Sequence, residues 1–246
     1  KENLPFKLTI AQERTIKEIS EDISLAKPMR RLVQGDVGSG KTVVAAMSMY
    51  ISAKNNSQSV LLCPTEVLAE QHFKNFSAWF KNLNIKIELL TGKMPVSKRR
   101  GIYQDLENGE IDILIGTHAV FQEKVKMKNL GLVVVDEQQR FGVKQRFDLV
   151  KKSSDQIMPH QLFMTATPIP RTLAMTIFAD LETSKIDELP PGRKPVETLV
   201  YSDKKKDEIV KRLETVCKSG NQVFWLCTMI EESENLDVQA ADEAKE

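Results

Sequence analysis

The sequence predicts an α/β fold in which helices cover both faces of a parallel sheet. Three observations lead to this prediction: short apolar runs alternate with longer helical patterns, a glycine-rich turn joins the first strand to a helix, and a later apolar strand ends in two carboxylates. Ligands bind beyond the carboxyl ends of parallel strands, so we expect the turn and the carboxylates at the same rim of the sheet.

The individual elements are predicted from periodicity and from the residues that interrupt it. The expected strands lie at 31–34, 59–63, 85–90, 111–115, 130–135 and 161–164. The expected helices lie at 42–53, 66–80 and 97–107. Ser97 is the predicted N-cap of the last helix. The run 130–135 is the strongest strand, because it is apolar throughout except for Gly131.

Two prolines and a glycine within 187–193 indicate a linker, after which strand and helix patterns start again. The expected elements there are strands at 196–201 and 222–227 and helices at 203–218 and 231–245. We therefore predict one domain over 1–190 and the incomplete start of a second α/β domain over 191–246, because the latter is short for a domain. With no initial methionine, the chain is expected to be an excised fragment.

Composition excludes several classes of protein. The 246 residues include 35 basic and 34 acidic side chains, for a net charge of +1, so this is not a polybasic coat for nucleic acid. The aromatic share of 6% argues against a surface of stacked bases. Cys63, Cys217 and Cys227 are widely spaced, which indicates neither zinc nor disulfides. Without a signal peptide or a membrane-spanning apolar run, a cytoplasmic protein is expected.

The glycine-rich turn over 35–42 matches the phosphate-binding pattern GxxxxGK[ST] between a strand and a helix. Its expected nucleotide-binding residues are Gly35, Asp36, Val37, Gly38, Ser39, Gly40, Lys41 and Thr42. Lys41 would reach the β- and γ-phosphates of ATP, and the Thr42 hydroxyl would bind Mg²⁺. The alternative is a chance glycine-rich turn, which the flanking elements argue against.

Asp136 and Glu137 end the strongest predicted strand. Asp136 would hold hydrated Mg²⁺, and Glu137 would orient and deprotonate the attacking water. Taken alone, the pair could equally be an ordinary acidic turn. Together with the phosphate loop, it predicts an ATP hydrolase with ATP and Mg²⁺ as cofactors.

The run 136–139, Asp-Glu-Gln-Gln, resembles the DEx(H/Q) box of superfamily-two helicases. The segments 8–12, 64–71, 116–118 and 165–168 are similar to that family's adenine-recognition segment and motifs Ia, Ib and III, in the family's order. The resemblance implies two RecA-like domains. It also implies that Gln12 reads adenine, since an amide can pair with the base edge, and that Thr165 and Thr167 couple nucleotide state to domain closure.

The runs 136–143, 164–175 and 187–193 closely resemble the RecG family of bacterial branched-DNA helicases. That resemblance implies ATP-driven translocation on duplex DNA and remodelling of stalled forks and Holliday junctions in repair and recombination. Gln139 stands where we expect His in that family; it still offers hydrogen bonds between γ-phosphate and DNA, but it does not titrate near neutral pH. The transcription-repair coupling translocases are the alternative family, and Leu-Pro-Pro-Gly-Arg within 187–193 favours RecG.

The RecG resemblance also implies a wedge domain and the rest of a second motor domain, with an arginine finger, outside this chain. A finger contributes about 10³–10⁵ in rate, so this chain is expected to bind ATP–Mg²⁺ but to hydrolyse it slowly and to unwind nothing.

Contacts with DNA are expected at motifs Ia and Ib, without sequence reading. The candidates are Thr65, Gln71, Thr117 and His118. For Thr117 and His118 a capping role is an equal alternative, Glu66 is expected to favour a helix N-terminus, and the basic runs 98–100 and 124–128 are expected to be solvated. The expected partners are ATP and branched or duplex DNA, with no membrane, and the protein is expected to be a monomer.

Two other classes of function are weighed against this one. A GTPase-like switch would need a guanine-reading Asn-Lys-x-Asp element, and the expected region contains none. A catalytically idle module that binds ATP and DNA is the second alternative.

Overall fold

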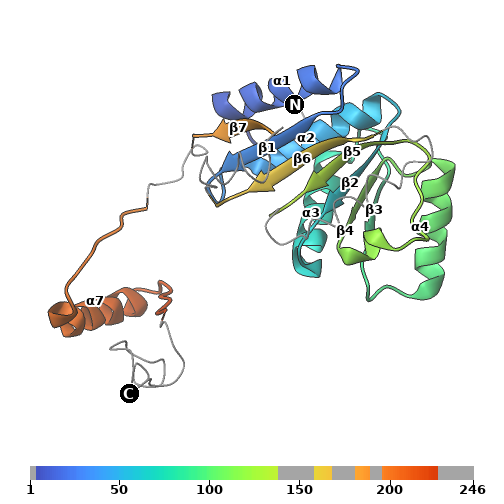
Figure 1. The fold of residues 1–246 in the computed structure, drawn as a ribbon. Coiled ribbons are helices and arrows are strands. Elements are labelled where there is room, and N and C mark those ends of the chain that lie inside the picture. The colour runs from blue at the N-terminus through green and yellow to red at the C-terminus, as the bar shows by residue number, and fades with distance from the viewer. Residues whose placement is uncertain (1–3, 138–157, 168–180, 189–195, 227–246) are drawn as a thin grey trace, which may run out of the picture. The chain divides into compact units, whose positions relative to one another are not determined.

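The computed structural model describes residues 4–137, 158–167, 181–188 and 196–226 (Figure 1). The chain divides into two compact units, Lys1–Arg193 and Lys194–Glu246, called here the first and second units.

A seven-stranded sheet with the order β3-β4-β2-β5-β6-β1-β7 forms the centre of the first unit (Figure 1). Its strands are β1 (Arg30–Gly35), β2 (Gln58–Leu62), β3 (Ile87–Leu90), β4 (Ile113–Gly116), β5 (Leu130–Val135), β6 (His160–Thr165) and β7 (Glu182–Ile186). Every strand pair is parallel, so all the carboxyl ends meet at one rim. We call this the carboxyl rim and the opposite one the amino rim. The predicted α/β fold with a parallel sheet is confirmed.

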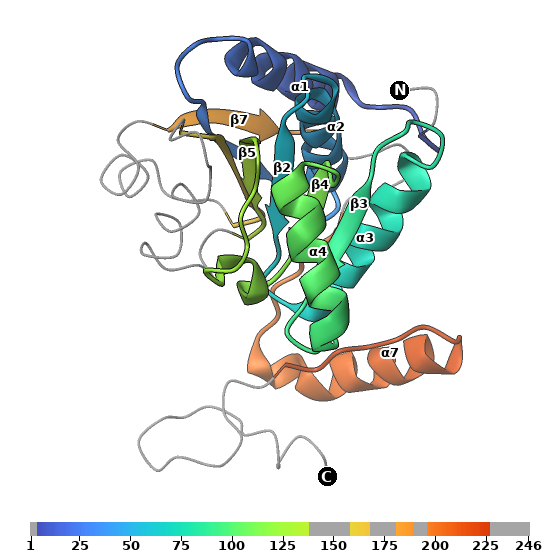
Figure 2. The same cartoon turned by 90° about the vertical axis from the view of Figure 1, so that its right-hand side faces the viewer.

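The two faces of the sheet carry separate hydrophobic cores. The helices on the two faces can be followed in Figure 2. Helices α1 (Ile10–Ile23), α2 (Lys41–Lys54) and α3 (Glu66–Trp79) pack on the first core. Helix α4 (Val96–Asn108) and the 3₁₀ turn η1 (His118–Phe121) pack on the second.

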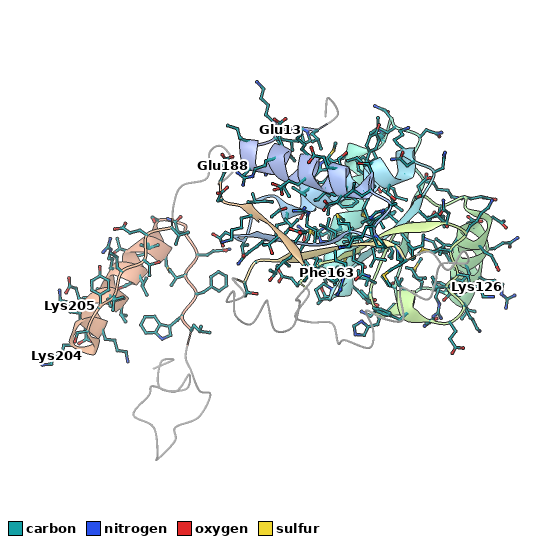
Figure 3. The ribbon with its side chains drawn as sticks, turned by 45° about the horizontal axis from the view of Figure 1, so that its top comes forward. Glu13, Lys126, Phe163, Glu188, Lys204 and Lys205 are labelled. Atoms are coloured by element: carbon teal, nitrogen blue, oxygen red, sulfur yellow. The ribbon has the colours of Figure 1, made fainter. Side chains whose placement is uncertain are left out.

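Strand side chains alternate between these two cores. Val134 of β5 enters the first core and Val133 the second, as does Phe163 of β6 (Figure 3). Burying each such side chain contributes about 1.5–3 kcal/mol. A sheet that is apolar on both faces is therefore held firmly, and it fixes the positions of the loops at its rims.

Helix α1 and strand β7 were not among the predicted elements. Thr9 and Gln12 form a capping box at the start of α1, since the Thr9 hydroxyl accepts from the Gln12 N–H and the Gln12 amide oxygen accepts from the Thr9 N–H. Glu188, beside this turn in Figure 3, accepts from the Ala11 N–H at 3.0 Å and so satisfies another donor. Strand β7 is an edge strand that buries only Ser184 and Ile186, so it lacks an apolar signal.

The predicted cap at Ser97 is wrong. Helix α4 begins at Val96 after Pro95, so Ser97 lies inside the first turn, where its hydroxyl cannot act as the cap.

The second unit contains the 3₁₀ turn η3 (Asp203–Lys205) and helix α7 (Lys206–Lys218). These two elements together span the helix predicted at 203–218. The strand predicted at 196–201 is wrong. The strand predicted at 222–227 is also wrong over 222–226, the part of it that the structure describes. Their apolar side chains are exposed instead: Val200 and Leu226 are each 95% exposed. A strand needs a pairing partner, and the described residues of this unit offer none. The helix predicted at 231–245 lies outside the described residues.

Within the part of the chain that the structure describes, no helix combines the length and the apolar character needed to cross a membrane.

Candidate active site

The phosphate loop connects β1 to α2 at the carboxyl rim. Gly38 and Gly40 have φ angles of 76° and 87°, which side-chain-bearing residues rarely adopt. A Cβ on Gly40 would lie 2.2 Å from the Gln12 Nε2, so the loop also needs the missing side chain for space. The N-terminus of α2 has no side-chain cap, which leaves backbone N–H groups available to an anion.

Ser39 supplies a further sign that the loop fits a ligand rich in oxygen. Its side chain is 1% exposed, and its Oγ has no hydrogen-bond partner among the described residues. A buried hydroxyl without a partner is unfavourable, and a phosphate oxygen would satisfy it.

Lys41 lies in the field of the acidic residues that end β5. Its Nζ donates to the carbonyl oxygens of Gly35 at 2.7 Å and Asp36 at 3.0 Å. Burial lowers the pKa of Lys41, and the charges of Glu137, Asp136 and Asp36 oppose that shift. Because such charge effects act over short distances, the lysine and the two strand-end carboxylates occupy the same part of the rim.

Gln12 connects α1 to the phosphate loop. It is 3% exposed, its Nε2 donates to the Ser39 carbonyl at 2.8 Å, and its Oε1 accepts from the Thr9 N–H. Each polar atom keeps one further bonding position, a second N–H and a second lone pair. Contact with adenine through these positions stays a prediction.

Asp136 and Glu137 leave β5 in different backbone conformations. The Asp136 N–H donates to the Leu62 carbonyl at 2.9 Å, which extends the pairing of β5 with β2 by one bond. Glu137 has a φ of 49°, a left-handed conformation that is strained for a residue other than Gly, Asn or Asp. Backbone strain of this kind clusters at functional sites.

Sequence reasoning missed His72, a buried residue of α3 whose Nε2 lies 3.0 Å from the Asp136 Oδ2. A single histidine inside an amphipathic helix carries no motif that could have revealed it. Cys63, also buried, follows β2 at the same rim; burial and the charge of Asp136 raise the pKa of its thiol, so it stays protonated.

Thr165 is the last residue of β6, the strand between β5 and β1, and Thr167 follows two residues later. The Thr165 Oγ1 accepts from the Thr167 N–H at 3.1 Å and lies 2.9 Å from the Thr167 Oγ1. This small turn therefore lies between the strand that ends in Asp136 and the strand that leads into the phosphate loop. Gln139 lies outside the described residues.

The candidate DNA contacts lie at the loops after β2 and β4. Thr65 caps α3 by accepting from the Leu68 N–H at 3.3 Å, and Gln71 is exposed on that helix. Thr117 is 9% exposed and makes no side-chain cap, while His118 is exposed. The capping alternative is thus wrong for Thr117, whose side chain does not cap η1.

Glu66 lies in the first turn of α3, as expected, and forms an ion pair with Lys93 at 2.9 Å. The Lys93 hydrogen bond lowers the pKa of Glu66, and the Glu66 hydrogen bond raises that of Lys93. The loops after β2 and β3 are therefore tied together at the rim.

No group of three or more His, Cys, Asp or Glu side chains able to hold a metal occurs among the described residues. Mg²⁺ fits the rim all the same, because it is commonly held by one or two carboxylates together with water and substrate phosphates.

The DEAD/DEAH box helicase family matches residues 9–176. The chain is 51% identical over 245 residues to the ATP-dependent DNA helicase RecG of Aquifex aeolicus, covering 100% of this chain and 31% of that protein. It is 52% identical over 241 residues to the RecG of Escherichia coli K12, covering 97% and 35%. A solved structure of RecG bound to a three-way DNA junction matches with a TM-score of 0.78 at 41% identity, covering 90% of this chain and 29% of that one.

The chain thus spans about a third of the length of the curated relatives it matches. The resemblance to RecG-type helicases is confirmed along the chain. With the family match extending over more than half of its residues, the chain belongs to the DEAD/DEAH box helicase family.

Proposed function

We propose that this chain carries the ATP-hydrolysing part of a RecG-type DNA helicase motor, which remodels branched DNA in repair and recombination. The observation that carries the proposal is the buried Lys41 of the phosphate loop in the field of Asp136 and Glu137. The RecG relatives, named ATP-dependent DNA helicases, support the class of reaction.

The nucleotide site works through residues that converge on the carboxyl rim. Lys41 exchanges its two carbonyl partners for phosphate oxygens, and the backbone N–H groups at the start of α2 bind the remaining phosphate oxygens. Thr42 and Asp136 would hold Mg²⁺, which would supply positive charge to stabilise the phosphates during hydrolysis. Glu137 accepts a proton from the attacking water, and Gln12 contacts adenine.

The DNA partner is bound through its backbone without sequence reading. We assign this role to Thr65, Gln71, Thr117 and His118. Thr165, Thr167 and Gln139 relay nucleotide state to DNA, which the place of β6 between β5 and β1 supports.

The proposal extends to the organisation of the whole protein. Residues 191–246 form the start of a second RecA-like domain. The working protein is a cytoplasmic monomer, and branched or duplex DNA is its substrate.

The experiment compares Lys41→Ala with Lys54→Ala, an exposed lysine at the other end of the same helix. Charged hydrogen bonds contribute about 1.5–3 kcal/mol each, so we expect Lys41→Ala to weaken ATP–Mg²⁺ binding about 10- to 100-fold by calorimetry. Lys54→Ala should bind as the wild type does. Equal affinities for the two variants would contradict the phosphate-loop assignment.

The DNA part of the proposal is tested separately in the full-length protein, by comparing ATP hydrolysis with forked, duplex and single-stranded DNA. Forked DNA should stimulate most. A preference for single strands would contradict the branched-DNA substrate and leave the ATP site standing.

A further inference from the structure

His72 and Asp136 form a buried polar contact between two segments that are distant in sequence. His72 is 6% exposed and Asp136 9% exposed, and the imidazole Nε2 lies 3.0 Å from the Oδ2 of the carboxylate. An ionised carboxylate only accepts hydrogen bonds, so Nε2 carries the proton and donates it. This contact engages Oδ2 and leaves Oδ1 as the oxygen that would bind a metal ion.

The second observation is the opposite ring nitrogen of His72. Its Nδ1 is buried and has no hydrogen-bond partner among the described residues. Phe76 lies beside the imidazole, with ring centroids 6.1 Å apart. An apolar side chain would fill this space without leaving a polar atom unpaired, so packing alone does not account for a histidine here.

We propose that His72 is a positioning residue for the metal-binding carboxylate of Asp136. Its Nε2–H fixes one oxygen of the carboxylate and thereby orients the other toward Mg²⁺. The inference rests on the proposed ATP–Mg²⁺ site. Partners that hydrogen-bond to a metal ligand orient it, and their loss commonly weakens metal binding by about 10- to 100-fold.

The contact also joins the segment that follows β2 to the segment that follows β5 at the carboxyl rim. His72 lies about two turns into α3, whose N-cap Thr65 follows β2, and Asp136 follows β5. A helix transmits displacement as a rigid body over two turns. The orientation of Asp136 is therefore set by the helix that starts at the proposed DNA-binding loop.

The first test is ¹⁵N NMR of the histidine side chains of the chain, which has only three. His72 should show the Nε2–H tautomer, and its resonances should shift when ATP and Mg²⁺ are added. His160, whose Nδ1 accepts from the Met29 N–H at 2.9 Å, serves as a reference that should not shift. An Nδ1–H tautomer for His72, or no response while ATP–Mg²⁺ is bound, would overturn the proposal.

The second test is a double-mutant cycle that measures the Mg²⁺ concentration for half-maximal binding of a fluorescent ATP analogue, with binding in EDTA as the internal reference. We expect His72→Phe to raise this concentration about tenfold and His72→Gln, which keeps an N–H donor, to raise it less. Asp136→Ala should raise it more, and His72→Phe should add nothing to Asp136→Ala. Lys74→Gln, at an exposed position of α3, is the matched control.

Additive effects of His72→Phe and Asp136→Ala, or an unchanged Mg²⁺ requirement in His72→Phe, would contradict the positioning role. Should His72→Phe fail to fold by circular dichroism, His72→Gln and the NMR measurement still decide. A wild-type chain that binds the analogue equally in Mg²⁺ and in EDTA would contradict the proposed ATP–Mg²⁺ site itself.

Discussion

The two rims of the sheet treat backbone strain differently. Three residues other than glycine have a positive φ: Asn56, Asn84 and Glu137, among the described residues. The two asparagines lie in turns at the amino rim, before β2 and β3, and asparagine tolerates this conformation. Glu137 lies at the carboxyl rim. Glutamate does not favour a positive φ, so we attribute its presence there to the proposed role of its side chain. This contrast supports the proposed nucleotide site at the carboxyl rim.

Hydrogen bonding gives the same contrast. At the amino rim the Gln58 side chain donates to the carbonyl oxygens of Leu106 and Ile111 and accepts from the Asn129 N–H. At the carboxyl rim Ser39 and His72 each keep a buried atom without a partner among the described residues. Ser59, near the start of β2, is the exception to this pattern.

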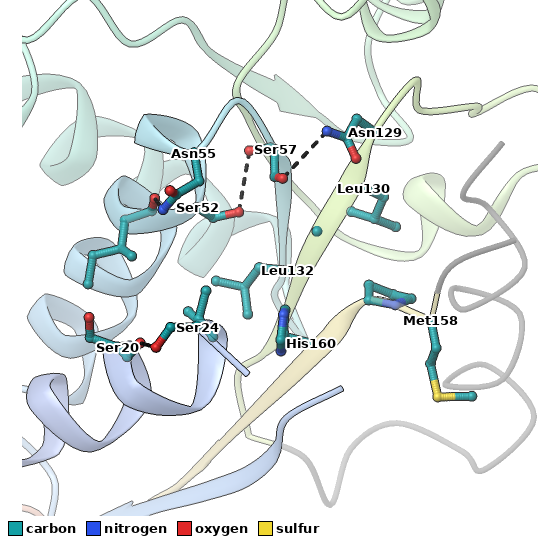
Figure 4. Close-up of a pocket in the computed structure, with 14 residues that line it drawn as sticks. Ser20, Ser24, Ser52, Asn55, Ser57, Asn129, Leu130, Leu132, Met158 and His160 are labelled. Carbon is teal, nitrogen blue, oxygen red and sulfur yellow. Dashed lines mark hydrogen bonds between the residues drawn. The ribbon is translucent and has the colours of Figure 1, made fainter. Parts of the chain in front are cut away.

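The amino rim also has a pocket of about 470 Å³, between the ends of α1 and α2 and the starts of β2, β5 and β6 (Figure 4). Its polar side chains bond to their neighbours: the Ser24 hydroxyl donates to the Ser20 carbonyl, and the Ser52 hydroxyl to the Ser57 carbonyl. In this pocket, therefore, the serine hydroxyls have partners within the protein, unlike the Ser39 hydroxyl of the carboxyl rim.

The largest effect should come from Glu137→Gln, which removes the proposed base and keeps the size of the side chain. In the complete enzyme, we expect ATP hydrolysis to fall about 10²- to 10⁴-fold while ATP remains bound. Single-turnover hydrolysis of radiolabelled ATP is the measurement, with Glu107→Gln on the exposed side of α4 as the control. Retained turnover would rule out Glu137 as the base and weaken the functional contrast between the rims.

Gln58→Leu should have the largest effect at the amino rim. It would remove the side-chain partner of the Ile111 carbonyl and of the Asn129 N–H, whereas the Leu106 carbonyl still accepts from the Gly109 N–H at 3.1 Å. We therefore expect a loss of roughly 3 kcal/mol in the free energy of unfolding. Urea denaturation measures it, and Gln104→Leu at an exposed position of α4 should change stability little. ATP affinity should stay at the wild-type value in the folded fraction, and a specific loss of binding would show that the rims are not separate.

A pair of reciprocal substitutions tests the strain directly. Glu137→Asn should stabilise the protein by about 1 kcal/mol because asparagine tolerates the left-handed conformation, raising Tm by about 2–4 °C while abolishing hydrolysis. Asn84→Glu should lower Tm by a similar amount without affecting hydrolysis. Calorimetric Tm shifts of the same sign for both variants would refute this account.

The smallest effect concerns pH at the amino rim. Burial lowers the pKa of His160, the first residue of β6, and its unprotonated Nδ1 accepts from the Met29 N–H. The unfolded chain therefore binds the proton more readily, so stability should fall as the pH drops through the usual histidine range. Tm measured at about pH 7.5 and about pH 5.5 should fall less in His160→Gln than in the wild type. An equal fall in both would assign the effect to other groups.

Much of the sheet could be predicted because strands buried on both faces are apolar runs, as 130–135 is. The edge strand β7 could not, since Glu182 and Lys185 are exposed and only one neighbour, β1, pairs with it. The predicted strand at 196–201 shows the reverse failure, in which an apolar pattern without a partner does not form a strand.

The site could be predicted as far as its chemistry lies in contiguous motifs. The phosphate loop and Asp136 followed from local patterns, and the sheet order brings them to one rim. The contact of His72 with Asp136 depends on how α3 packs against the sheet, and no local pattern encodes it. The Thr9–Gln12 capping box could have been predicted from the sequence, but Gln12 was predicted only to contact adenine.

The position of β1 has a consequence for biosynthesis. Both of its neighbours, β6 and β7, are encoded more than a hundred residues later. At ribosomal rates of about 5–20 residues per second, the strand that leads into the phosphate loop waits on the order of ten seconds before either pairing partner has been made. A nascent chain cannot complete its nucleotide pocket during that interval, so ATP cannot assist the earliest stage of folding, and the backbone groups of β1 wait without their strand partners.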